Sequence, residues 1–119
     1  MSEGESGPAM GKRAAALAIM RDALDLADAV VAKGAEAFFS ADDPTQLAAG
    51  SYALVILGEA VARMPQEVVD AYPELPWREA RGIRNVMAHY QATLDPVTVW
   101  ETLEHDLDGF RRLVDSYGP

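Results

Sequence analysis

Residues 12–33, KRAAALAIMRDALDLADAVVAK, decide the fold class of this chain. Apolar residues recur there at steps of three and four, the spacing that lines one face of a helix, and they are Leu17, Met20, Leu24, Ala27 and Val31. The stretch predicts a long amphipathic helix from about Lys12 to Lys33, with Gly34 as its stop. Residues 35–41 are expected to add one turn that folds Phe38 and Phe39 back onto the core.

Two further helices are predicted before the next proline-rich connection. Asp43-Pro44 is typical of an N-cap followed by proline at the first helical position, and this helix is expected to reach about Met64. Its residues 52–57, YALVIL, are apolar on nearly all sides, so the helix is either buried or faces both a core and a partner. Pro65 is expected to open a short helix over residues 66–71.

The rest of the sequence predicts two more long helices. Prolines make residues 72–76 a rigid connection, because each disfavours helical backbone in the residue before it. A helix is expected from Pro76 through His89, and Asp95-Pro96 predicts a last one that reaches about Tyr117. The expected fold is therefore all-α, an antiparallel up-and-down bundle of four to five helices. Residues 1–10 are expected to be a disordered tail, and residues 11–119 a single domain.

Composition and charge exclude several classes of function. The 119 residues include no cysteine, which removes disulfides, thiolate metal sites and cysteine nucleophiles. No apolar run is expected to reach the roughly 18 residues of a membrane span, and Glu3 and Glu5 precede the first lysine, unlike a signal peptide. A cytoplasmic location fits these expectations. The net charge of −9 argues against general nucleic-acid binding, so any RNA contact must be local; a basic partner surface fits the charge equally well.

A basic cluster stands out in this acidic chain, on the helix predicted before His89. Arg78, Arg81 and Arg84 lie within seven positions of one another. Arg81, Asn85 and His89 are spaced i, i+4, i+8 and share one helical stripe. Arg84 lies roughly 140° around the helix from His89. The two can reach one phosphate if the helix ends or distorts near His89.

These residue types suit metal-free RNA cleavage. Arginine binds phosphate through two parallel hydrogen bonds, histidine exchanges a proton near neutral pH, and asparagine can orient either group. The ribose 2′-OH would attack the adjacent phosphorus to give a cyclic phosphate. This reaction needs both a base and an acid, whereas one chain offers one histidine at this place. A twofold dimer would supply both.

A structural interpretation of the same residues is more common. An Arg-Asn-His stripe is usually a solvated face or an ion-pair patch. The aspartates of the first helix, Asp22, Asp25 and Asp28, could neutralise the arginines of the basic helix across the bundle. Glu59 is a further candidate partner for an arginine of that helix. His105 is interpreted as a surface histidine in an acidic setting. Two histidines 16 residues apart, with no other ligand spacing, predict no metal site. No phosphate-binding glycine loop or nucleophilic serine motif is present, and no cofactor is expected.

The basic helix also resembles a known family. Arg84-Asn85-Val86-Met87-Ala88-His89 is similar to the R-N-x-x-x-H motif of HEPN ribonucleases. Residues 57–60 (LGEA), 72–79 (YPELPWRE) and 82–85 (GIRN) resemble the HepT-like branch, in the right order and spacing. The likeness covers roughly residues 12–117. The six-residue motif alone is weak, whereas Pro-Trp-x-x-x-x-Gly-Ile-Arg-Asn-x-x-x-His is far more specific.

The resemblance implies a function and a site. Such proteins are helical bundles that dimerise and place the motifs of both subunits at one cleft, and many are RNA-cleaving toxins that use no metal. Their antitoxin is typically a minimal nucleotidyltransferase, which can attach AMP to a tyrosine of the motif. By this resemblance Arg84 binds the phosphate, His89 is the acid and base, and Asn85 supports it. Arg78 and Arg81 are the expected substrate-binding residues.

One position departs from the family pattern. The branch usually has tyrosine two places after the histidine, where this chain has Gln91, and a tyrosine lies one place earlier, at Tyr90. A natural variant, a shift of the role to Tyr90 and a substitution introduced at position 91 all remain open. AMP modification is therefore in doubt, and Tyr90 could instead stack on an RNA base.

Two rival interpretations remain open. One is a non-catalytic nucleotide- or partner-binding module that works only in complex with its nucleotidyltransferase, which the acidic charge favours slightly. The other is a plain dimerising bundle, in which Arg84 and His89 would be ion-paired within the protein rather than open to a cleft.

Overall fold

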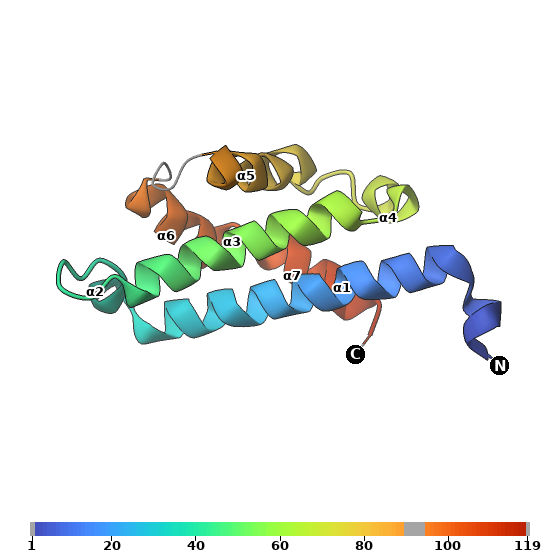
Figure 1. Cartoon of the computed structure of the whole chain (residues 1–119), viewed down its shortest axis with the longest axis horizontal. Helices are drawn as coiled ribbons and strands as arrows, with labels where there is room; N and C mark the ends of the chain where they lie inside the picture. The colour runs from blue at the N-terminus through green and yellow to red at the C-terminus, as the bar shows by residue number, and fades with distance from the viewer. Residues whose placement is uncertain (1, 90–94, 119) are drawn as a thin grey trace.

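A computed structural model describes the backbone of residues 2–89 and 95–118, and the side chains of residues 11–83 and 95–118. This described part is α-helical and contains no β-strand, which confirms the all-α prediction. Its helices (Figure 1) are α1 (Ser2–Lys33), α2 (Ala35–Phe38), α3 (Thr45–Arg63), α4 (Gln66–Ala71), α5 (Trp77–His89), α6 (Pro96–His105) and α7 (Asp108–Ser116).

Helix α3 lies at the centre of the bundle. It packs along α1 on one side and along α5 on the other. Behind them in the view of Figure 1, α6 contacts both α1 and α3, and α7 contacts α1. The molecule is elongated, 52 × 27 × 26 Å, because α1 runs along its length. The core is built from apolar side chains of every helix, and α2, α4 and α5 each add one described buried residue, namely Phe38, Val68 and Ala80. The largest fully buried side chains are Phe38, Phe110, Met20, Leu54, Leu103 and Leu113.

The predicted apolar character of α3 has two consequences. Leu54, Leu57 and Val61 are buried in the core, but Tyr52 is 61% exposed, so one side of the YALVIL stretch faces outward.

The expectation that no segment is long enough for a membrane span needs correction, because α3 passes that test by length and composition. A buried core helix passes the same test; 39% of the apolar window of α3 is buried inside the bundle, including Leu54, Leu57 and Val61.

Most predicted boundaries before His89 are confirmed. Gly34 separates α1 from α2 with a φ of 95°, a left-handed conformation that favours glycine. Helix α4 covers the predicted residues 66–71. Helix α1 begins at Ser2 rather than Lys12, so its bounds include the predicted tail. The division into a tail and one domain stays a prediction. Phe38 is buried as expected, whereas Phe39 is 44% exposed, which corrects the prediction for that ring.

The N-cap of α3 is Pro44, which has no side-chain cap, so the predicted Asp43 N-cap with proline at the first helical position is wrong by one residue. The Asp43 carboxylate accepts hydrogen bonds from the backbone N–H of Thr45, at 3.0 Å, and from the Thr45 hydroxyl. These two bonds hold the pKa of Asp43 below its ordinary value of 3.8, with a smaller contribution from the charge of Lys33. The helix itself begins at Thr45, one residue later than expected.

The last predicted helix is two helices, and this corrects the expected count of four to five. Helix α6 ends at His105 and α7 begins at Asp108, with Asp106 and Leu107 between them. Aspartate and glycine are weak helix formers, and Asp106, Asp108 and Gly109 cluster at the break. The break also brings the backbone of Gly109 against the Leu75 side chain, so closely that a Cβ at position 109 would collide with it.

Candidate functional site

Helix α5, which carries the predicted site, is fixed to the bundle by its first turns. The indole nitrogen of Trp77 donates a hydrogen bond to the carbonyl oxygen of Tyr72 at 2.8 Å, and the Trp77 ring packs edge-to-face on Phe110 at 5.5 Å between centroids. Ala80 is buried and Ile83 is half-buried against the core. These contacts set which face of α5 points away from the bundle.

Arg78 and Arg81 lie on that outer face. Both side chains are exposed, and neither takes part in a hydrogen bond or ion pair with the described residues. Arg111 of α7 differs from them, because its guanidinium group forms ion pairs with Asp28 and Asp108. Two free guanidinium groups on one helix face leave a local cationic surface in a chain of net charge −9.

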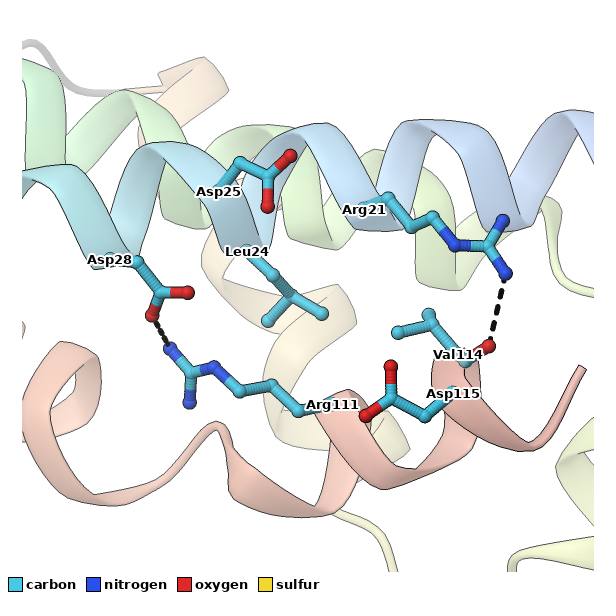
Figure 2. A pocket seen from close by; sticks show the side chains of 7 residues that line it. All are labelled: Arg21, Leu24, Asp25, Asp28, Arg111, Val114 and Asp115. Atoms are coloured by element: carbon cyan, nitrogen blue, oxygen red, sulfur yellow. Dashed lines mark hydrogen bonds and ion pairs between the residues drawn. The ribbon is translucent and has the colours of Figure 1, made fainter. Parts of the chain in front are cut away.

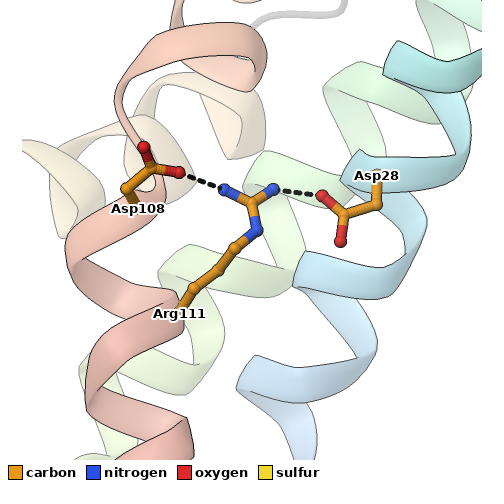
Figure 3. A network of polar contacts seen from close by, with 3 residues as sticks. All are labelled: Asp28, Asp108 and Arg111. Carbon is orange, nitrogen blue, oxygen red and sulfur yellow. Dashed lines mark hydrogen bonds and ion pairs between the residues drawn. The ribbon is translucent and has the colours of Figure 1, made fainter.

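None of the acids proposed to neutralise these arginines forms an ion pair with Arg78 or Arg81. Asp28 of α1 pairs with Arg111 of α7 (Figure 3), not with an arginine described on α5. Asp22 and Asp25 are exposed on α1. Glu59 forms an ion pair with Arg63 of its own helix at 3.0 Å, and its predicted pairing with an arginine of α5 stays a prediction. The structural interpretation therefore finds no support at Arg78 and Arg81.

The central residues of the predicted motif have a described backbone only. Positions 84, 85 and 89 belong to the α-helix of α5, so the i, i+4, i+8 spacing of positions 81, 85 and 89 is confirmed for the backbone. The side chains of Arg84, Asn85 and His89 lie outside the described residues, and so do Tyr90 and Gln91 altogether. The approach of Arg84 to His89, and the roles of all five residues, stay predictions.

A groove beside α5 was not predicted from the sequence. It has a volume of about 480 Å³ and is lined mainly by apolar side chains of α3, α5 and the α6–α7 break, among them Leu57, Ile83 and Leu107. Its charged residues are Glu79 and Asp106, both acidic. Carboxylates repel phosphate, so this groove is not the phosphate-binding part of the site. Asp106 and Leu107 of the α6–α7 break line this groove. The apolar spacing of the sequence did not predict that break, so it did not predict the groove.

A second hollow, of about 310 Å³, lies between α1 and α7 (Figure 2). Arg21 donates hydrogen bonds there to the carbonyl oxygens of Val114, at 3.0 Å, and of Gly118. Arg111 lies between the carboxylates of Asp28 and Asp108 (Figure 3). Since both guanidinium groups are engaged in joining the helices, we interpret this hollow as a structural contact.

The other histidine of the chain, His105, lies on α6. His105 is exposed, and its Nε2 lies 3.3 Å from a carboxylate oxygen of Glu104, which confirms the surface histidine in an acidic setting. Among residues 11–83 and 95–118, no three histidine or acidic side chains are placed to hold a metal ion.

Comparison with known proteins gives this helical surface a context. A family model described as "Ribonuclease HepT-like" matches residues 20–117, which include all of α5. A Methanocaldococcus jannaschii protein named "Putative RNase" is 32% identical over 59 residues, 50% of this chain and 51% of that protein. A Thermococcus cleftensis protein named "Probable ribonuclease HepT" is 33% identical over 73 residues, 61% of this chain and 66% of that protein.

A Caldanaerobacter subterraneus protein, also named "Putative RNase", is 29% identical over 72 residues, 60% of this chain and 64% of that protein. The matched stretch spans about half the length of the Methanocaldococcus relative. No solved structure shows a significant match to the chain.

Proposed function

This chain belongs to the HepT-like ribonuclease family, and from that premise we propose that it is a metal-independent endoribonuclease, the toxin of a toxin–antitoxin pair. The observation that carries the proposal is the family match over residues 20–117, within which the Arg84-Asn85-x-x-x-His89 string is intact. Relatives named as ribonucleases support RNA cleavage as the activity. The exposed, unpaired Arg78 and Arg81 support a local binding surface for RNA phosphates.

The proposed reaction is an internal transfer at phosphorus. The ribose 2′-oxygen attacks the adjacent phosphorus and loses its proton to one imidazole, while a second imidazole protonates the departing 5′-oxygen. The P–O5′ bond breaks, and the products are a 2′,3′-cyclic phosphate and a 5′-hydroxyl. The charge of Arg84 would stabilise the phosphorane oxygens, and Asn85 would orient His89. Both imidazoles would be His89, one from each subunit of a homodimer.

The proposed biological partner is a cognate minimal nucleotidyltransferase that acts as antitoxin in the cytoplasm. AMP attached to Tyr90, or to a tyrosine restored at position 91, would block the motif and silence the nuclease. The competing function is a non-catalytic binding module that works only within that complex. The charge of −9 favours this alternative, because it weakens binding to any polyanion.

Cleavage of total cellular RNA by the purified protein in excess chelator tests the proposal. The native protein should cut, and both His89→Ala and Arg84→Ala should abolish cutting while leaving the melting temperature nearly unchanged. His105→Ala, which removes an exposed histidine of α6, is the matched control and should cut normally.

The remaining outcomes separate the alternatives. If no variant cuts, and Gln91→Tyr does not restore cutting, the binding module becomes the better explanation. If Arg84→Ala and His89→Ala both lower the melting temperature strongly, these residues have a structural role and the catalytic assignment is wrong.

A further inference from the structure

The end of the bundle formed by α2 and the first turns of α6 carries an exposed apolar patch, which we call the Trp100 patch. It consists of the exposed side chains of Phe39 and Val97 and the half-buried ring of Trp100. The described residues include three exposed large hydrophobic side chains, and two of them, Phe39 and Val97, belong to this patch; the third is Tyr52. Val97 is 55% exposed and lies one helical turn before Trp100 on α6.

The aromatic part of the patch rests on a rigid base. The Phe39 and Trp100 rings lie 6.1 Å apart between centroids, and each also contacts the ring of Phe38, at 5.0 and 5.1 Å. Phe38 is buried in the core, where its ring lies against Gly50. The exposed Phe39 ring and the half-buried Trp100 ring are therefore held in place before any partner arrives, and preorganisation of this kind lowers the entropic cost of binding.

The segments that form the patch are rich in acidic residues. Six exposed carboxylates belong to the segments that form it: Glu36, Asp42, Asp43, Asp95, Glu101 and Glu104. The basic residue described near them is Lys33, whose charge acts on Asp43, and His105 is paired with Glu104. A negative surface of this kind repels nucleic-acid phosphates and attracts lysine and arginine.

We propose that the Trp100 patch is a docking surface for a basic segment of a partner protein, one that places an apolar or aromatic anchor between lysine or arginine residues. An apolar centre within a polar rim is the usual anatomy of protein interfaces, with aromatic residues as their energetic centre. Its residues lie at the end of α2 and on α6, whereas the motif of the proposed nuclease site lies on α5. Charge complementarity selects a basic protein segment over RNA.

Two labelled helical peptides of equal positive charge test this inference by fluorescence anisotropy. One carries leucine and tryptophan anchors among its lysines, and the other has alanine in their place. The anchored peptide should bind the full-length protein at least tenfold more tightly than the alanine peptide. Phe39→Ser and Val97→Ser should each remove most of this advantage. Tyr52→Ser, which removes the third exposed hydrophobic side chain, is the matched control and should keep it.

Several results would overturn the inference. Equal binding of the two peptides would show that charge alone attracts them. If Tyr52→Ser lost the affinity advantage of the anchored peptide as fully as Phe39→Ser does, the Trp100 patch would not be its binding surface. A change of molecular mass in Phe39→Ser by sedimentation would identify a second copy of the chain as the occupant. Loss of oligoribonucleotide binding in Val97→Ser would identify RNA instead. If Phe39→Ser fails to fold, Val97→Ser alone decides the result.

Discussion

Gly50 of α3 lies directly against Leu103 of α6. A methyl group added at position 50 would be 2.7 Å from Leu103 Cδ1 and 2.9 Å from Phe38 Cε1. Both neighbours are buried, so neither side chain has free space to move into. The missing side chain of Gly50 is what allows α2, α3 and α6 to meet at this end of the bundle.

Gly50→Ala should therefore lower the free energy of unfolding. Overpacking of a core costs about 1–3 kcal/mol, and the better helix propensity of alanine returns up to about 1 kcal/mol. We expect a net loss of roughly 1–2 kcal/mol in urea unfolding. Gly82→Ala on α5 is the control, because its added Cβ meets no atom within 4 Å, and it should raise stability by about 0.5–1 kcal/mol. Equal effects of the two substitutions would contradict the packing argument.

Removal of the Arg111 side chain should weaken the joint between α1 and α7 only slightly. Its partners Asp28 and Asp108 are both well exposed, so water and salt screen the attraction. A double-mutant cycle of Arg111→Ala with Asp28→Ala should give a coupling energy of about 0.2–1 kcal/mol. The coupling should fall further in 1 M NaCl. A coupling that is large and insensitive to salt would mean that this pair is less hydrated than its exposure indicates.

Stability should depend on pH through Asp43 in acid solution. Because the pKa of Asp43 is lowered in the folded protein by its bonds to Thr45, its contribution is complete above the ordinary value of 3.8 and is lost as the pH falls through the folded value. Asp43→Asn keeps an acceptor for the Thr45 N–H but cannot titrate. The melting temperature of the native chain should therefore fall more steeply than that of Asp43→Asn below about pH 4. Parallel curves between pH 2.5 and 6 would rule out this linkage.

If the proposed nuclease activity is found, Arg81→Ala should weaken RNA binding with little effect on the chemical step. A phosphate contact contributes roughly 0.7 to the slope of log affinity against log salt for single strands. KM should therefore rise, its salt dependence should become shallower by about that amount, and kcat should change little. Arg112→Ala removes an exposed arginine of α7 and is the control of equal charge. An identical response in both variants would mean that overall charge, not α5, controls binding.

The helices were largely predictable because their signals are local. The stripe from Leu17 to Val31, Gly34, the Asp43-Pro44 pair and Pro65 each act within a turn or two of their position. The break at Asp106 was missed, since Val99, Leu103 and Leu107 continue the apolar spacing as though one helix persisted. The contact that accompanies the break joins Gly109 to Leu75, which no local pattern reveals.

The candidate site was predictable only in part. A motif predicts that Arg84, Asn85 and His89 share a helix, and the backbone of α5 agrees. Sequence spacing could not decide whether Asp28 neutralises the α5 arginines, because ion pairs depend on which helices become neighbours. In the fold that acid faces Arg111 instead. The Trp100 patch also escaped prediction, because aromatic residues are usually assigned to the core and Phe39 was expected there.

The bonds from Arg21 to the end of α7 have a consequence for synthesis of the protein. Arg21 is separated by 93 residues from Val114 and by 97 from Gly118. Helix α1 emerges from the ribosome early, but α7, whose end accepts the hydrogen bonds of Arg21, is made only after α5 is complete. Contacts between such distant parts of the sequence form late in folding. A growing chain would thus carry a finished α5 on an open, incompletely packed bundle, which delays any activity that needs the closed fold until translation is nearly over.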